Sequence, residues 1–198
     1  MKNRKITLRK SILVALIFTA MIGNATNELN NDPKNRIKKT TFSLNHVKTG
    51  NQLKIKDLNG IILYKEDIKT SGTYSKGFDL TSLPNESYVF ELEKDLEIKS
   101  FPFTVTSQTV VFEKEETIIH KPFVTVKDNY IYVSKLALNE EPLDIKIYYQ
   151  EASDLIYSEK VENTKNIQKI YKLKSTAKGD YKIVLTSNGR EYYESITL

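Results

Sequence analysis

Apolar residues recur at every second position in most segments after residue 40, and this spacing constrains the fold more than any other feature of the chain. Because successive side chains of a β-strand point to opposite faces, the alternation predicts half-buried antiparallel strands with one polar face. No later segment shows a convincing helical period, so we predict an all-β protein. The clearest runs are Leu53 and Ile55; Tyr88, Phe90 and Leu92; and Tyr181, Ile183 and Leu185.

Turn-forming pairs separate these runs. Asn59-Gly60 and Asn188-Gly189 each lie between two apolar segments. An Asn-Gly pair supplies the two residues that tolerate a positive φ in a type I′ turn. We therefore expect a tight β-hairpin at each pair. Pro84-Asn85 and Lys178-Gly179 mark further turns.

The chain also contains an internal repeat. Residues 62–105, moved forward by 93 positions, align without a gap on residues 155–198, and the apolar pattern agrees along the whole length although only eight of the 44 pairs are identical. Since that pattern decides which face is buried, two similar domains are expected in tandem. Matching positions include Tyr64 and Tyr157, Glu66 and Glu159, Leu80 and Leu173, Leu92 and Leu185, and Phe103 and Ile196.

Both repeats place a tyrosine after a tight turn, eight residues beyond a leucine. These are Tyr88 after Leu80 and Tyr181 after Leu173. In Greek-key sandwiches a tyrosine at this place returns its hydroxyl to the upstream backbone, which is called a tyrosine corner. We therefore take Tyr88 and Tyr181 as structural candidates for such corners.

Three segments in order carry a family resemblance: residues 53–64 (LKIKDLNGIILY), 78–84 (FDLTSLP) and 88–92 (YVFEL). Together they resemble the C-terminal sorting domain of type IX secretion cargo in the Bacteroidetes, and the second repeat is similar. The whole layout resembles small flavobacterial secreted proteins with two such domains. The resemblance implies two tandem immunoglobulin-like, Greek-key β-sandwich domains after a signal peptide. It also implies that the second domain serves as a sorting tail.

The N-terminus has the organisation of a signal peptide. A basic segment up to Lys10 precedes the apolar run 11–22, and Gly23 and Ala25 supply small residues for cleavage after residue 25. The apolar run has about 12 residues, whereas a membrane-spanning helix needs roughly 20. We therefore expect export to the periplasm, the cell surface or the medium. The signal peptide would engage the membrane only during export.

These features divide the chain. Residues 1–25 form the signal peptide, and residues 26–40, rich in Asn and Lys, form a flexible leader. Residues 41–112 form the first β-sandwich domain. Residues 113–128 are expected to hold the linker and the first strand of the second domain, which continues over 129–198.

Charge argues against nucleic acid as a partner. The chain has 30 Lys and Arg against 25 Asp and Glu, and five of the basic residues lie within residues 1–25. The remaining 25 basic residues balance the 25 acidic ones, so residues 26–198 carry no net charge. Binding to a phosphate backbone requires a sustained basic excess or patch.

No group of residues has the pattern of an active site or a cofactor site. The chain contains no cysteine and only two histidines, His46 and His120. We therefore expect neither a metal site built from several such ligands nor a histidine that acts as a catalytic base. The carboxylates of 113–116 and 140–141 have the pattern of solvated loops rather than an acid–base pair. Glu66 and Glu159 occupy matched repeat positions, where outward charge on a strand is the expectation and a shared ligand site the alternative. We predict no catalytic, cofactor-binding or metal-binding residue.

Tyrosine is the most suggestive residue type. The pairs Tyr148/Tyr149 and Tyr192/Tyr193 lie in the second repeat, and one member of each pair should point outward because neighbours on a strand face opposite ways. Exposed tyrosines are frequent in binding surfaces. These four residues are candidate interaction aromatics. The alternative is that they cover the edges of a small core that contains no tryptophan.

Three functions remain open. The first is a non-enzymatic exported β-sandwich protein that acts as an interaction or structural module of the periplasm or cell surface. The second is a type IX secretion cargo or sorting module. The third is a carbohydrate-binding module, which usually displays Trp or Tyr platforms. An unknown protein or a surface glycan is the expected partner.

Overall fold

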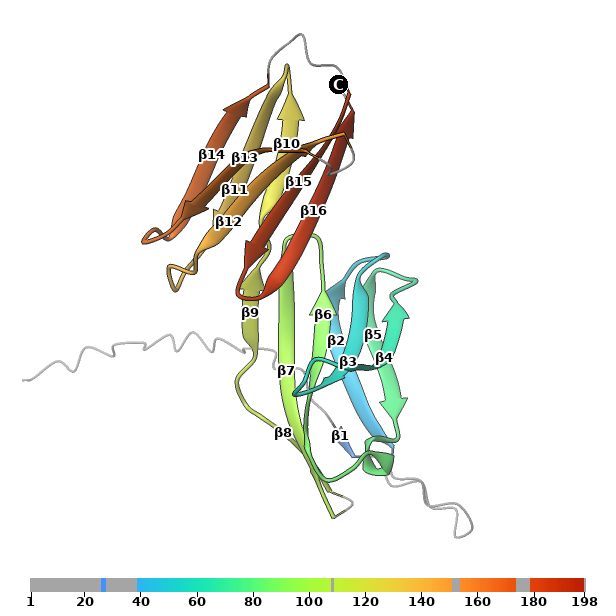
Figure 1. The fold of residues 1–198 in the computed structure, drawn as a ribbon. Coiled ribbons are helices and arrows are strands. Elements are labelled where there is room, and N and C mark those ends of the chain that lie inside the picture. Colours follow the sequence, from blue (N-terminus) through green and yellow to red (C-terminus); the bar gives the residue numbers. More distant parts are fainter. Residues whose placement is uncertain (1–25, 28–38, 108, 151–153, 174–178, 198) are drawn as a thin grey trace, which may run out of the picture.

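Two separate groups of buried apolar side chains divide the structure into two domains. The computed structural model describes residues 26–27, 39–107, 109–150, 154–173 and 179–197. The predicted signal peptide, residues 1–25, and residues 28–38 of the expected leader lie outside the described residues. Strands β1–β9 form the first domain and strands β10–β16 the second (Figure 1).

The first domain is a sandwich of two antiparallel sheets. One sheet has the strand order β1-β2-β5, and the other has the order β4-β3-β6-β7-β8, with β9 also paired to β7. The elements are β1 Thr26–Asn27, β2 Thr40–Val47, β3 Gln52–Asp57, β4 Ile62–Asp67, β5 Gly72–Phe78, the 3₁₀ turn η1 Leu80–Ser82, β6 Ser87–Glu93, β7 Glu97–Thr106, β8 Thr109–Phe112 and β9 Thr117–His120.

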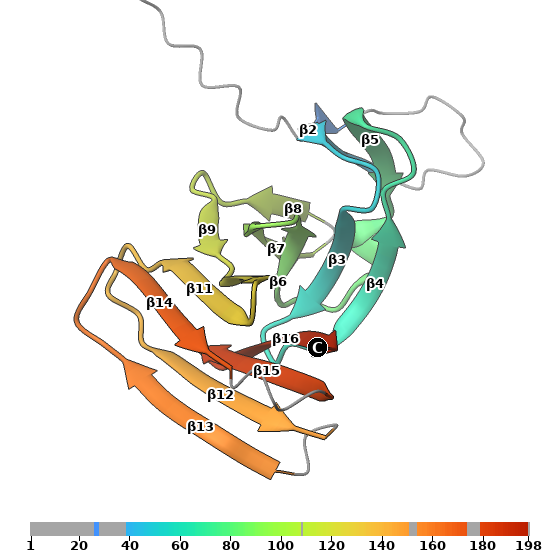
Figure 2. The ribbon, with the colours of Figure 1, turned by 90° about the horizontal axis from the view of Figure 1, so that it is seen from above.

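The second domain repeats this plan. One sheet has the order β10-β11-β14 and the other β13-β12-β15-β16. Figure 2 shows β12, β13 and β15 side by side in one layer. The elements are β10 Phe123–Lys127, β11 Tyr130–Leu136, β12 Leu143–Tyr149, β13 Asp154–Val161, β14 Asn166–Lys172, β15 Asp180–Ser187 and β16 Arg190–Thr197.

The two domains share one Greek-key topology. In each, the first, second and fifth strands form one sheet, and the fourth, third, sixth and seventh strands form the other, so the chain crosses between sheets repeatedly. This confirms the predicted all-β fold of two tandem immunoglobulin-like sandwiches. The strand registers also agree with the repeat offset of 93, except that residues before the first hairpin, such as Leu53 and Ile145, are offset by one residue fewer. Equivalent cross-strand pairs are Leu53–Leu92 and Ile145–Leu185, and Tyr88–Phe103 and Tyr181–Ile196.

The core of the first domain is aromatic. Phe90 is fully buried, and its ring lies 4.1 Å from that of Phe42 and 5.2 Å from that of Phe103, measured between centroids. Phe112, contributed by β8, stacks on Phe103 with a centroid distance of 5.3 Å. Offset and edge-to-face ring contacts of this kind add to the free energy gained by burial.

The core of the second domain is aliphatic at the equivalent places. Ile183, which lies 93 positions after Phe90, is fully buried, as are Ile145 and Ile131. Tyr149, Tyr171 and other half-buried side chains pack around this cluster. The two repeats therefore bury the same strand faces with different side chains.

Of the two Asn-Gly pairs, one forms the predicted turn and one does not. Asn188 and Gly189 both have positive φ, 49° and 70°, and join β15 to β16 as a two-residue type I′ turn. At the other pair only Gly60 has a positive φ. There the loop spans 58–61, because the Asp57 carboxylate accepts the amide hydrogen of Ile61 at 2.7 Å and closes a longer turn. The tight β10–β11 turn uses Asp128-Asn129 instead.

The segment between the domains contributes strands to both. β9 pairs with β7 of the first domain, and after Lys121 and Pro122 the chain enters β10 of the second. Within the expected leader, Thr26–Asn27 form β1, which pairs with β2. Among the described residues, no helix is long and apolar enough to span a membrane.

Replacement of Phe90 by Ala should destabilise the first domain by about 3–5 kcal/mol, because it leaves a cavity among stacked rings. The equivalent Ile183→Ala change should cost the second domain about 2–5 kcal/mol. Amide hydrogen exchange measured by NMR should show faster exchange mainly in the domain that carries the substitution. Equal loss of protection in both domains after either change would contradict two separate cores.

Candidate functional site

Tyr88 has the geometry of a tyrosine corner. Its ring is buried in the first core, and its hydroxyl donates to the backbone carbonyl of Pro84 at 3.0 Å. The carbonyl lies four residues upstream, across the turn that precedes β6. Tyr181 is buried at the equivalent place in the second domain. The upstream segment 174–178 lies outside the described residues.

The four candidate interaction tyrosines are not equally accessible. Tyr193 is exposed, whereas Tyr192 packs against the second core. Tyr148 is half-buried, and Tyr149 packs on the ring of Tyr181 with 5.1 Å between centroids. Of this set, Tyr193 is therefore the side chain best placed to meet a partner.

Glu66 stands at the centre of a hydrogen-bonded cluster in the first domain, which we call the first clasp: Tyr64, Glu66, Tyr74 and Lys76. The Glu66 carboxylate accepts from the hydroxyls of Tyr64 and Tyr74, the latter at 3.0 Å, and from the ammonium of Lys76 at 2.8 Å. Glu66 lies on β4 and Lys76 on β5, the edge strands of opposite sheets. The clasp therefore ties the two sheets together along one flank.

An equivalent second clasp joins β13 to β14: Tyr157, Glu159, Lys169 and Tyr171. The Glu159 carboxylate accepts from Tyr157 at 3.1 Å, from Tyr171 at 2.8 Å and from Lys169. Lys76 and Lys169 are also 93 positions apart. This identity in the repeat is the sequence signal that could have identified the cationic partner of each glutamate. The matched glutamates are thus half-buried and bonded to their own domain rather than directed to solvent.

The electrostatics of the clasps favour a fixed negative charge. Hydrogen bonds from Lys76 and Tyr64 lower the pKa of Glu66 to about 2. The hydrogen bond from Lys169 likewise lowers the pKa of Glu159. Burial, together with the bond to Glu66, raises the pKa of Tyr74. A carboxylate held ionised by three donors is a poor general acid and a weak base, so the arrangement is suited to structure rather than catalysis.

One strand of each clasp, β4 in the first and β13 in the second, also carries a β-bulge with an apolar residue. On β4 the register shifts so that Leu63 is the extra residue, and on β13 the extra residue is Ile156. Both side chains are about half exposed. In the first domain the exposed apolar surface continues into the adjoining loop. We call this surface the apolar hairpin; it consists of Leu58, Ile61, Ile62 and Leu63, which are 78%, 60%, 49% and 47% exposed.

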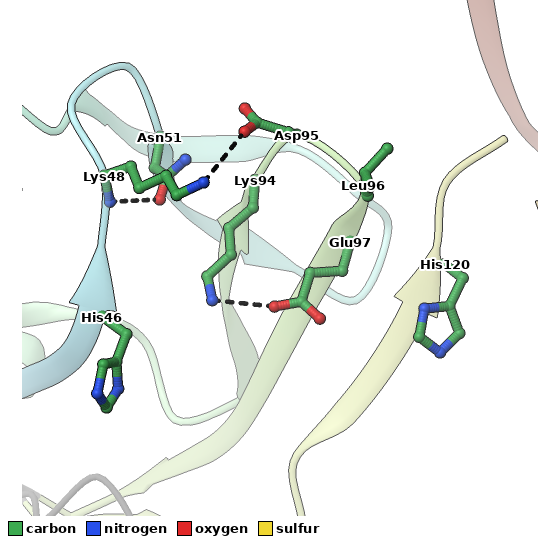
Figure 3. A pocket seen from close by; sticks show the side chains of 8 residues that line it. All are labelled: His46, Lys48, Asn51, Lys94, Asp95, Leu96, Glu97 and His120. Carbon is green, nitrogen blue, oxygen red and sulfur yellow. Dashed lines mark hydrogen bonds and ion pairs between the residues drawn. The ribbon is translucent and has the colours of Figure 1, made fainter. Parts of the chain in front are cut away.

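Both histidines line one pocket at the end of the first domain, and most of its other lining residues are charged. The pocket has a volume of about 330 Å³. Figure 3 shows His46 and His120 on opposite sides of it, with the ion pair between Lys94 and Glu97, 2.9 Å apart, lying between them. A second ion pair joins Lys48 to Asp95 at 3.9 Å. Since the charges neutralise each other and the imidazoles stand apart, the pocket offers no converging set of donors.

The second pocket is larger and mainly apolar. It has a volume of about 570 Å³ and lies on the clasp flank of the second domain, next to Tyr157 and Tyr171. Exposed Ile170 and Ile156 border it. Pockets of this size with a few polar groups commonly take small apolar groups of a ligand. Within the described part of the chain, no group of three or more His, Cys, Asp or Glu side chains is placed to hold a metal ion.

A buried ion cluster joins the two domains. Glu91 on β6 is 5% exposed and accepts from Lys56 at 2.5 Å and from the guanidinium of Arg190 at the start of β16. Burial alone would raise the pKa of Glu91, but the hydrogen bonds from Arg190 and Lys56 outweigh it, so the pKa is lowered. Glu93 accepts from Lys54 at 2.8 Å and from Lys121 at 3.0 Å. The cluster fixes the β15–β16 turn against the sheet of the first domain.

The carboxylates of 113–116 lie in the loop between β8 and β9, and those of 140–141 lie in the loop between β11 and β12. Glu113, Glu115 and Glu116 are exposed, and Glu116 accepts from Lys99 at 3.0 Å. Glu140 is exposed at the turn before β12. One oxygen of Glu141 accepts weakly from Asn139 at 3.4 Å, and its other oxygen is buried without a hydrogen-bond partner.

The clasps should make stability depend on pH. The pKa of Glu66 is about 2 in the folded chain and near 4.5 when unfolded. The stabilisation that the ionised carboxylate gives the folded state is therefore complete above pH 4.5 and is lost as the pH falls towards 2. Glu66→Gln should cost about 1–2 kcal/mol at pH 7. It should also flatten the fall in unfolding free energy between pH 4.5 and 2, measured by urea denaturation. Glu115→Gln, which alters an exposed carboxylate without described contacts, should keep the wild-type slope; an unchanged slope in Glu66→Gln would contradict this role.

Arg190→Ala should loosen the junction between the domains, because Glu91 loses its cationic partner from the second domain. The expected cost is about 1–3 kcal/mol. Residual dipolar couplings should then report a broader distribution of relative domain orientations, with each domain internally unchanged. Arg190→Lys should restore the orientation in part, because an ammonium cannot match both carboxylate oxygens as a guanidinium does. Couplings identical to wild type in Arg190→Ala would show that the cluster does not set the orientation.

Comparisons with known proteins identify no family for this chain. No protein-family model and no curated protein sequence matches the chain. Among solved structures, a human protein described as the OSCAR ligand-binding domain is similar over 81% of this chain and 89% of that one, at 8% identity and a TM-score of 0.24. Similarity at this level supports no argument about fold or ligands.

Proposed function

We propose that the protein is an exported, non-enzymatic interaction module of the periplasm or cell surface. The apolar hairpin is the observation that carries this proposal. Its four large aliphatic side chains all lie within six residues, and each is roughly half exposed or more. Clustered apolar groups on a water-facing surface mark contact sites, because their removal from water is favourable.

The shape of the hairpin favours a protein partner. The 58–61 loop is braced by the Asp57 carboxylate and by the Gly60 amide, which donates to the Asp57 carbonyl at 3.1 Å. A braced loop loses little conformational freedom on binding, so its apolar side chains are presented at low entropic cost. Leu155 and Ile156 repeat the exposed pair Ile62 and Leu63 in the second domain.

The hydrogen bonds of the three best-satisfied carboxylates are consistent with a binding role. Glu66, Glu159 and Glu91 are each held by cationic or hydroxyl donors from a neighbouring strand or domain. Those contacts stabilise the sandwich and the junction. They leave the carboxylates committed to structure, which supports the non-enzymatic proposal.

A type IX secretion role for the second domain is the second candidate. It is favoured by the separate core of that domain, which buries eleven apolar side chains without help from the first. A self-contained C-terminal sandwich is what a removable sorting tail requires. In this case the first domain would be the delivered part.

One experiment in the native host tests both candidates. A photo-crosslinking amino acid replaces Ile61, and Glu86, an exposed residue in another turn of the same domain, is the matched control position. We expect the intact mass of residues 26–198 in the periplasmic or outer-membrane fraction, with a protein adduct at position 61 and none at position 86.

The alternatives give different results. A surface or medium product cleaved near residue 120 would favour the sorting role of the second domain. Retention of residues 1–25 in a cytoplasmic product would overturn export. Adducts only to lipid, or equal adducts at both positions, would overturn a protein-binding hairpin.

A further inference from the structure

The seventh strand of the first domain, β7, and the seventh strand of the second domain, β16, differ in what lies on their outer side. β7 of the first domain is covered along its outer edge, since β8 pairs with Phe103–Thr106 and β9 with Glu97–Ser100. β16 is the equivalent strand of the second domain and ends its sheet, with no described strand on its outer side (Figure 1). Among the described residues, the outer edge of β7 is thus occupied and the equivalent edge of β16 is open.

The open edge keeps the backbone geometry of the occupied one. β16 pairs with β15 in unbroken register over eight residues. The type I′ turn directs the backbone N–H and C=O of Arg190 towards β15. Because these groups alternate along a strand, those of Glu191, Tyr193 and Ser195 point to the outer edge. The equivalent of Ser195 is Pro102, whose carbonyl accepts the amide hydrogen of Glu113 at 3.0 Å. Ser195 therefore presents a carbonyl at the place where the first domain binds an added strand.

The side chains show what is missing. Phe103 is fully buried because Phe112 of β8 stacks on it, whereas its equivalent, Ile196, is only half-buried. Two residues earlier, the half-buried Phe101 of the first domain is replaced by the exposed Glu194. An added strand would find an apolar contact at Ile196 and an unneutralised carboxylate at Glu194.

The other exposed edge of the same sheet is less suited to pairing. β13 carries the bulge at Ile156 and turns the charged Glu159 inward to its clasp. Bulges and inward charges on an edge strand hinder the addition of another strand. β16 has no bulge in its pairing with β15.

We propose that β16 binds an extended peptide segment of a partner protein as an added antiparallel strand. The segment carries a large apolar side chain opposite Ile196 and, two residues further along, a basic side chain that faces Glu194. This rests on the proposed interaction function and names a second surface for it, separate from the apolar hairpin. In the first domain, Phe112 and Lys114 of the chain itself have this spacing.

The probe is a labelled peptide that copies residues 109–114, Thr-Val-Val-Phe-Glu-Lys. Titrated into the full mature chain, it should shift NMR signals of β16 rather than those of the occupied β7. Replacing the peptide's Phe by Ser should weaken binding at least tenfold, since burial of that ring supplies most of the apolar contact. No saturable shift in β16 would overturn the proposal.

Two matched pairs test the register. N-methylation of the peptide amide equivalent to Glu113 removes the bond to the Ser195 carbonyl and should abolish binding, whereas N-methylation at the Phe amide, which points away, should leave it nearly unchanged. Glu194→Lys should weaken binding about threefold, and a peptide with Glu in place of Lys should restore it. Glu191→Lys, on the opposite face of β16, is the control and should have no such effect. Equal effects of both methylations would overturn strand addition.

The result can be separated from the test of the apolar hairpin. Crosslinking at position 61 without peptide binding to β16 would reject strand addition and leave the interaction function standing. Peptide binding without crosslinking would locate the interaction at β16 alone.

Discussion

Both domains depend on burying one face of each sheet against the other. The chain contains no cysteine or tryptophan, so no disulfide crosses the sandwich and the inward side chains supply the cohesion. The first domain meets this requirement with stacked rings around Phe90, and the second with the branched aliphatics around Ile183. Packing of the two sheets also positions the strands that carry the clasps, the tyrosine corner and the ion cluster between the domains.

The parts of the fold that follow from local pattern could be predicted. Alternation at Tyr88, Phe90 and Leu92 identifies the buried face of one central strand, and the same spacing 93 residues later identifies its copy, since a strand has only two faces to choose between. The turn at Asn188-Gly189 was also predictable, because both residues tolerate the positive φ that a type I′ turn requires.

The rest depends on contacts between distant segments. Asn59-Gly60 looks identical in sequence to the other pair, but the Asp57 side chain competes for the Ile61 amide and lengthens the loop. Glu66 resembled a solvated strand residue because its partner Lys76 lies on the opposite sheet. Glu91 and Arg190 are 99 residues apart, and no periodicity connects them. A sequence pattern does not show that a charged side chain is buried, because its burial depends on a counterion that only the folded structure brings close.

The passage from β9 to β10 has a mechanical consequence. Only Lys121 and Pro122 separate the two strands. The Lys121 amide donates to the Leu96 carbonyl at 2.8 Å, and its ammonium holds Glu93. A load applied between the two domains would reach the first domain through this passage and act along the four residue pairs that join β9 to β7. Such a ladder, pulled along its strands, resists as a unit, so the junction transmits tension without first unravelling the linker.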